Sequence, residues 1–300
     1  MVLVVFAPKS KCGNTEHCSA GTTGAARTKL ITDCKLLTTG EFLTPMIDQQ
    51  AGDPVCEASR YATQTVLKFA PFRPSFCLAM NIEQARFNMV EQQIRPWEVL
   101  DQDVLDLLYV VRREEFVPEV YRALAFSDLE IPLYENAAEG ERMMQPKLEA
   151  RILQELALRK SERVLEVGTG SGYLTALLAA RARHVHSVEI NPRLKAFGEE
   201  NLRRAGVENV TTELDDASQG WHRHAPYDII VLTGSTPILP PVLLTQLRAG
   251  GRLFAVVGDP PVMEARLTTR VGEGSYNTTD LFETCLAPLR NAPHSARFEF

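Results

Sequence analysis

The sequence lacks three features that would indicate a membrane protein, a nucleic-acid-binding protein or a zinc protein. No apolar run approaches the roughly 18 residues that a membrane-spanning helix needs. The net charge of −6 offers no broad basic surface for nucleic acid. The six cysteines include no Cys-x-x-Cys pair, the usual spacing of zinc ligands. We therefore expect a cytoplasmic globular protein with no membrane, nucleic-acid or metal partner, and no motif sets its oligomeric state.

Cysteine and charge are spread unevenly over the 300 residues. Five cysteines precede Met80, and only Cys285 follows it. Residues 1–79 carry 8 Lys and Arg against 6 Asp and Glu, whereas the rest carries 24 against 32. No helical or strand periodicity persists in residues 1–79, and their apolar start lacks the basic segment of a signal peptide. We predict a poorly ordered leader or extension over 1–79 and one domain over 80–300. A sharper hypothesis is that Met80 is the natural start and that residues 1–79 are an appended leader.

Residues 80–300 alternate between helix and strand patterns. We expect helices at residues 82–96, 104–111, 121–126, 148–158, 173–182, 192–205 and 240–247. We expect strands at residues 163–167, 185–190, 210–214, 227–232, 252–257, 263–271 and 280–286. Such alternation predicts an α/β fold: a doubly wound, mostly parallel, seven-stranded Rossmann-like sheet preceded by N-terminal helices. Sheets of this kind bind ligands at the carboxyl ends of their strands.

The strongest local signal is a glycine-rich turn between a buried strand and a helix, Gly168-Thr169-Gly170-Ser171-Gly172. Glycine permits unusual backbone angles and lets the main chain approach a ligand closely. A tight turn without a ligand is the alternative, although three glycines in five residues are costly unless something requires them. Tyr173 stands where a dinucleotide motif needs its third glycine, and no Gly-Lys-Ser/Thr of a P-loop follows. The Gly-x-Gly-x-Gly spacing is the form commonly seen for S-adenosylmethionine.

Two acidic positions follow the next strands. Glu189 ends the strand after the glycine turn, 21 residues beyond Gly168, where a carboxylate can accept both ribose hydroxyls. Asp215 and Asp216 follow the third strand, and one of them can accept a hydrogen bond from an adenine amino group. The alternative for each acid is simple solvation. Asp228, at the start of the fourth strand, reads as structural.

Together these residues resemble the S-adenosylmethionine-dependent methyltransferases, and the flanking motifs resemble one branch, the protein-L-isoaspartate O-methyltransferases. The resemblance covers Met80 to about Gly258. The motifs that carry it are Gln92-Gln93-Ile94-Arg95, Asp103-Val104-Leu105, Arg113-Glu114-Glu115-Phe116-Val117-Pro118, Gln145-Pro146, Glu166-Val167-Gly168-Thr169-Gly170-Ser171-Gly172-Tyr173, Gly220-Trp221, Ala225-Pro226-Tyr227-Asp228 and Gln246-Leu247.

The resemblance implies an enzyme that methylates the free carboxyl of isoaspartyl residues in damaged proteins, as a step of protein repair. Its implied cofactor is S-adenosylmethionine, and its implied partner is a protein or peptide that carries isoaspartate. The cofactor-binding residues that it implies are Gly168, Thr169, Gly170, Ser171, Gly172, Glu189, Asp216 and Ala217.

One segment departs from the family pattern. The family commonly reads Gly-Gln-Thr-Ile-Ser-Gln-Pro, whereas residues 140–146 read Gly-Glu-Arg-Met-Met-Gln-Pro. Met144 takes the place of the serine at the reactive centre, and a thioether cannot donate as a hydroxyl does. Arg142 takes the threonine position, where it either clamps an acceptor carboxylate with its guanidinium or is a solvated loop residue. Gln145 is the second expected substrate-binding residue.

The departure at Met144 leaves two alternative functions. One is a related methyltransferase with a different acceptor, such as a small-molecule acid. The other is a non-catalytic module that binds S-adenosylmethionine. Methyl transfer to a carboxylate needs no general base, because the group is ionised at neutral pH with a pKa of about 4. We expect His184 and His186 to be strand-face residues without a metal, and His222 and His224 to lie near the pocket rim.

Overall fold

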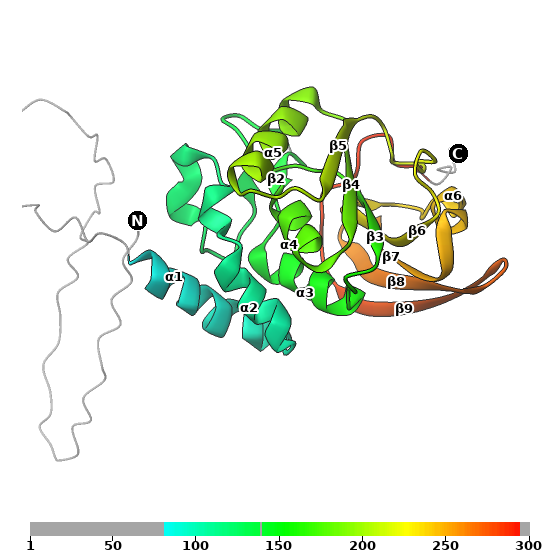
Figure 1. Ribbon diagram of the computed structural model, residues 1–300, viewed down its shortest axis with the longest axis horizontal. Helices are drawn as coiled ribbons and strands as arrows, with labels where there is room; N and C mark the ends of the chain where they lie inside the picture. The colour runs from blue at the N-terminus through cyan, green and yellow to red at the C-terminus, as the bar shows by residue number, and fades with distance from the viewer. Residues whose placement is uncertain (1–80, 139, 295–300) are drawn as a thin grey trace, which may run out of the picture. The chain divides into compact units, whose positions relative to one another are not determined.

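The computed structural model describes residues 81–138 and 140–294, so the predicted leader and the start at Met80 lie outside the described residues. Its main element is a seven-stranded sheet of order β5-β4-β3-β6-β7-β8-β9 (Figure 1). The strands are β3 (Arg163–Val167), β4 (His184–Glu189), β5 (Val210–Leu214), β6 (Tyr227–Thr236), β7 (Leu247–Asp259), β8 (Val262–Gly272) and β9 (Ser275–Glu283). A separate two-stranded ribbon pairs β1 (Ile131–Pro132) with β2 (Arg142–Met143).

The sheet confirms the predicted fold class. Strands β3 to β7 run parallel, and β8 and β9 add an antiparallel end. The chain builds outward from β3 through β4 to β5 and then returns to place β6 on the other side of β3. This reversal makes a switch point between β3 and β6, which is where sheets of this class bind ligands.

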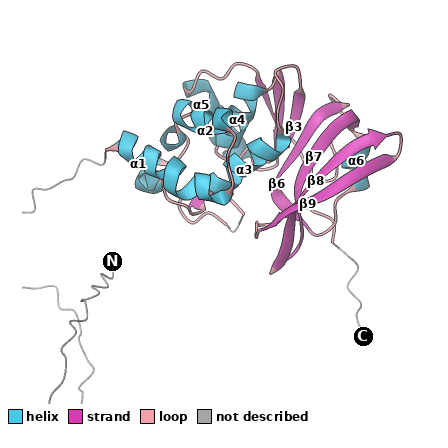
Figure 2. Ribbon diagram, turned by 90° about the horizontal axis from the view of Figure 1, so that it is seen from below, coloured by secondary structure: helices cyan, strands magenta, loops and turns pink. Residues whose placement is uncertain are grey.

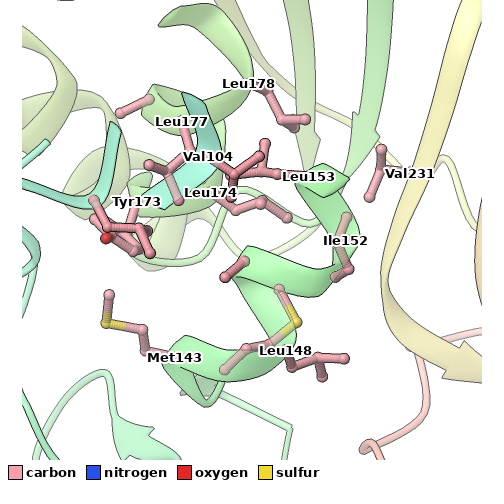
Figure 3. Packing of buried hydrophobic residues seen from close by; sticks show 14 of the residues in the cluster. Val104, Met143, Leu148, Ile152, Leu153, Tyr173, Leu174, Leu177, Leu178 and Val231 are labelled. Atoms are coloured by element: carbon pink, nitrogen blue, oxygen red, sulfur yellow. The ribbon is translucent and has the colours of Figure 1, made fainter. Parts of the chain in front are cut away.

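Helices cover both faces of the sheet (Figure 2). They are α1 (Ile82–Asn88), α2 (Gln102–Val110), α3 (Pro146–Leu156), α4 (Tyr173–Arg181), α5 (Pro192–Arg204) and α6 (Pro241–Thr245). Alternate residues of a strand point to opposite faces. Val164 therefore packs with the α2–α5 side, whereas Leu165 packs with Leu243 of α6. Figure 3 shows Ile152 of α3, Leu177 of α4 and Val231 of β6 within one buried cluster.

The first predicted helix is less regular than expected. Asn81 caps α1 by accepting a hydrogen bond from the Gln84 amide at 3.2 Å. The helix then widens into a π-helical turn at Met89–Ile94 and tightens into a 3₁₀ turn at Arg95–Trp97. Pro96 cannot continue an α-helix, since it lacks an amide hydrogen. Further 3₁₀ turns follow α2 at Arg113–Glu115 and Glu119–Leu124, the second replacing the predicted helix at 121–126.

Two boundaries near the C-terminus were wrong. The strand predicted at 280–286 is β9, which spans Ser275–Glu283. Its start was missed because residues 275–279 are mostly exposed and polar and show no apolar pattern. The strand expected at 252–257 begins earlier and ends later, because β7 spans Leu247–Asp259, where Gly250 takes a φ of +78°. Within the described ranges, no helix is long and apolar enough to cross a membrane.

Candidate active site

A pocket opens at the switch point, where β3, β4 and β6 end. Of the predicted site residues, nine line it: Arg142, Met144, Gly168, Thr169, Gly170, Ser171, Glu189, Asp216 and Ala217. Gln145 and Gly172 lie outside the lining. Gln145 is the N-cap of α3, where its carbonyl accepts from the Leu148 amide at 3.0 Å, and its substrate role stays a prediction.

The glycine turn is held against β6. Gly168 has a φ of +102°, and a Cβ there would lie 2.2 Å from the Thr233 hydroxyl oxygen. That hydroxyl donates toward the carbonyls of Val167, at 2.8 Å, and Gly168, at 2.9 Å. Only glycine fits this close approach. Thr233 lines the pocket, and no sequence motif indicated it.

Gly172 supports the turn from behind. Its φ is +80°, and a Cβ there would lie 2.9 Å from the carbonyl oxygen of Gly198 in α5. Asn201 of the same helix donates to the Ser171 carbonyl at 2.9 Å. Gly172 therefore allows α5 to pack against the turn, which presents Gly170 and Ser171 to the pocket.

Glu189 joins the ends of two strands. Its carboxylate accepts hydrogen bonds from the amides of Gly170 and Asn191, both at 3.0 Å, and its exposed fraction is 5%. The β4 end and the glycine turn are thus joined by one acid, and the predicted ribose contact of Glu189 stays a prediction. On the neighbouring loop, Asp216 accepts from the Ser218 amide at 2.9 Å and from the Asn291 side chain at 2.8 Å.

The pocket floor holds two buried carboxyl groups. Burial raises the pKa of Glu166 to about 8, although hydroxyls of Ser187 and Thr175 donate to its Oε2 at 2.6 and 2.5 Å. Its other oxygen, Oε1, is buried with no hydrogen-bond partner among the described residues. Burial also raises the pKa of Glu149 to about 7, despite its ion pair with Arg113.

Arg113 holds the main chain at Met144, within the 140–146 segment that departs from the family pattern. Its guanidinium is fully buried and donates to the carbonyls of Ala125, at 3.0 Å, and Met144, at 2.6 Å, in addition to pairing with Glu149. The guanidinium also lies 5.1 Å from the centre of the Tyr173 ring. The Met144 carbonyl is therefore held by Arg113 through a contact that does not involve the Met144 side chain.

A C-terminal strap, residues 286–290, forms the wall that sequence reasoning missed. Ser235 of β6 donates its amide to the Ala287 carbonyl and accepts from the Leu289 amide, both at 2.9 Å. Arg290 forms an ion pair with Glu141, which also accepts from Asn191 at 2.7 Å. The strap thus connects the end of β6 to the 134–142 loop, the segment that leads from β1 into β2 and that the structure describes except for residue 139.

The four histidines lie outside this pocket, so the expected rim position of His222 and His224 was wrong. The loop after Trp221 runs back over β4, where the His224 ring stacks on His186 with centroids 4.1 Å apart. Across residues 81–138 and 140–294, no group of three or more His, Cys, Asp or Glu side chains is arranged to hold a metal ion.

Known proteins match most of the described chain. A family model, Protein-L-isoaspartate(D-aspartate) O-methyltransferase, matches residues 84–292 and so extends beyond the resemblance that ended near Gly258. A protein-L-isoaspartate O-methyltransferase of Methanoculleus marisnigri is 40% identical over 205 residues, covering 68% of this chain and 90% of the relative. Protein-L-isoaspartate O-methyltransferase 1 of Syntrophobacter fumaroxidans is 37% identical over 199 residues, covering 66% and 91%.

Solved structures share the fold. A protein-L-isoaspartate O-methyltransferase superposes with a TM-score of 0.59 at 24% identity, covering 69% of this chain and 65% of that chain. A Plasmodium falciparum protein described as a putative member, in complex with S-adenosyl-L-homocysteine, gives a TM-score of 0.58 at 20% identity, covering 68% and 97%. The chain belongs to the protein-L-isoaspartate(D-aspartate) O-methyltransferase family.

Proposed function

We propose that residues 80–300 form an S-adenosylmethionine-dependent methyltransferase that modifies the carboxyl group of isoaspartyl residues in damaged proteins. One observation carries this proposal. The chain belongs to this family, and residues of its glycine turn line the same pocket at the switch point as residues of the 140–146 segment, which departs from the family pattern.

The residues present fit the cofactor. Glu166 Oε1 is a buried acceptor without a partner on the pocket floor, which suits the ammonium of a methionine moiety. Glu189 would bind the ribose hydroxyls, and Asp216 and Ala217 would lie at the adenine. When bound, S-adenosylmethionine supplies an electrophilic methyl group on a sulfonium sulfur.

The acceptor side needs a cationic group and exclusion of water. Arg142 is exposed at the pocket, where its planar guanidinium can bind a carboxylate through two parallel hydrogen bonds. A carboxylate acceptor is already ionised, so the chain need not supply a base. Its contribution is to orient the acceptor and to enclose the reaction between the 134–142 loop and the strap.

Met144 supports a second candidate acceptor. Its side chain is 7% exposed and belongs to the apolar cluster, so it presents a methyl thioether where the family presents a hydroxyl. A small-molecule acid could use the same pocket without that hydroxyl.

The deciding experiment measures radiolabelled methyl transfer to an isoaspartyl peptide, with the matching aspartyl peptide as control. We expect a base-labile ester on the isoaspartyl peptide alone. Met144→Ser should raise the rate about tenfold, since one added hydrogen bond is equivalent to about 1.4 kcal/mol. Arg142→Gln should raise the KM for the peptide and leave cofactor affinity unchanged.

Each alternative function has its own outcome. No transfer by either wild type or Met144→Ser, together with transfer to a small acid, would identify the second acceptor. Binding of S-adenosylmethionine without transfer to any component of a cell extract would indicate a non-catalytic module.

A further inference from the structure

A second pocket lies at the opposite edge of the sheet from the cofactor. Arg163 begins β3 and His184 begins β4, and the amino ends of parallel strands share one edge. The residues that line it are Ser161, Arg163, Arg183, His184, His186 and Arg248. We refer to it as the arginine–histidine pocket. None of these described residues also lines the cofactor pocket.

The arginine–histidine pocket concentrates positive charge in a chain whose net charge is −6. It contains three guanidinium groups. Asp228 offsets one of them, since its carboxylate pairs with Arg248 at 3.1 Å. Arg183 is exposed at the pocket. An anion that entered would therefore meet a net positive site with several hydrogen-bond donors.

Two of the lining side chains have buried nitrogen atoms without partners among the described residues. Arg163 donates through Nη2 to the Pro226 carbonyl at 2.8 Å, but its Nε is buried and unpaired. His186 is 8% exposed, and its Nδ1 is also buried and unpaired. Leaving a buried polar group unpaired costs about 1–3 kcal/mol, so native sites of this kind usually have a ligand or water as partner.

Both histidines have lowered pKa values, so the positive charge of the pocket comes from its arginines. Burial, together with the nearby His224, His184 and Arg163, lowers the pKa of His186 to about 4. His184 is fixed by a 2.9 Å contact between its Nε2 and the Thr211 hydroxyl. A neutral imidazole still offers one N–H donor.

We propose that the arginine–histidine pocket binds a phosphate group. Guanidinium groups match the oxygens of phosphate through paired hydrogen bonds, and the two positive charges that remain after the Arg248–Asp228 pair suit a dianion. The Ser161 hydroxyl and an imidazole N–H add neutral donors around the same space. The group can be free inorganic phosphate or the terminal phosphate of a small monoester, since the chemistry at the pocket is the same for both.

The test is a titration of the full-length protein with inorganic phosphate at constant ionic strength. Binding is measured by calorimetry and by the NMR signals of the histidine ring C–H groups. We expect one saturable site. The resonances of His184 and His186 should shift with the calorimetric Kd, whereas that of His222, which is exposed and outside the pocket, should not. A parallel titration with glycerol 2-phosphate distinguishes a monoester from the free ion.

Two matched variants locate the site. Arg183→Gln should weaken phosphate binding about tenfold, which corresponds to loss of one charge-assisted contact. Arg122→Gln removes the same charge from an exposed position outside the pocket and should leave the Kd unchanged. Both variants should bind S-adenosylmethionine as the wild type does, which shows that they are folded and separates this inference from the proposed activity.

Two results would overturn the proposal. One is the absence of saturable binding of phosphate or the monoester with a Kd below about 10 mM. The other is an equal loss of affinity in Arg183→Gln and Arg122→Gln, because that would assign binding to the overall charge.

Discussion

Replacing Glu166 with glutamine should make the folded protein more stable at alkaline pH. Glu166 is fully buried, and burial raises its pKa from 4.5 to about 8. The folded state therefore retains a proton that the unfolded state releases between these values. Its stabilising contribution is complete below pH 4.5 and is lost as the pH rises through about 8. Glutamine cannot ionise, so it removes this loss.

The size of the effect follows from the two pKa values. A pKa unit is equivalent to 1.36 kcal/mol, so a rise from 4.5 to about 8 amounts to about 5 kcal/mol of stability lost between pH 4 and pH 9. The amide oxygen of glutamine can keep the hydrogen bonds from the hydroxyls of Thr175 and Ser187. The variant should therefore match the wild type near pH 4 and exceed it by several kcal/mol at pH 9.

Urea unfolding at pH 4, 7 and 9 measures this difference. Glu200→Gln is the control, because Glu200 is half-exposed on α5 and Arg203 lowers its pKa. If wild type and Glu166→Gln lose stability in parallel as the pH rises, Glu166 does not carry the buried proton. The affinity for S-adenosylmethionine should fall in the same variant, since an uncharged amide replaces the acceptor on the pocket floor. Stability and binding thus change in opposite directions.

Three further substitutions test the site. Gly168→Ala should lower stability by more than about 2 kcal/mol and abolish cofactor binding, because the new Cβ would lie 2.2 Å from the Thr233 hydroxyl oxygen at a φ of +102°. Thermal unfolding measures the loss of stability, and calorimetry measures the loss of binding. Glu189→Gln should weaken S-adenosylmethionine binding by about 10–100-fold in calorimetry, since charge-assisted hydrogen bonds are lost. Arg113→Leu should cost about 3–5 kcal/mol in urea unfolding, because it leaves the Glu149 carboxyl buried without its cation.

The sequence predicted best those elements whose residue pattern lies within the element itself. Strands β3 and β5 begin and end at the predicted residues. The glycine turn lies at the pocket, and Glu189 bonds to it, because a parallel sheet brings adjacent strand ends together. These features depend on residues close in sequence or on one general rule of topology.

Contacts between distant segments could not be predicted in this way. The strap is placed by Ser235 and by the pair of Arg290 with Glu141, residues separated by 149 positions. Arg290 lies outside every motif, so no sequence pattern indicated that it pairs with Glu141. The start of the edge strand β9 was not predicted for another reason. Most of its residues face solvent, so no alternating apolar pattern marks where it begins.

The two halves of the pocket therefore differ in how they are built, and this bears on Met144. The cofactor half comes from β3, β4, β5 and the turns that follow them, whereas the acceptor half comes from the 134–142 loop, Met144 and the strap. Arg113 holds the Met144 carbonyl, so a new side chain at this position can change acceptor chemistry without moving the glycine turn. Met144→Ser should accordingly change the rate of methyl transfer while the Kd for S-adenosylmethionine stays within about threefold, less than the tenfold that 1.4 kcal/mol represents. A larger change in that Kd would show that the two halves are coupled, and the loss of the serine would then bear on cofactor binding as well as on the acceptor.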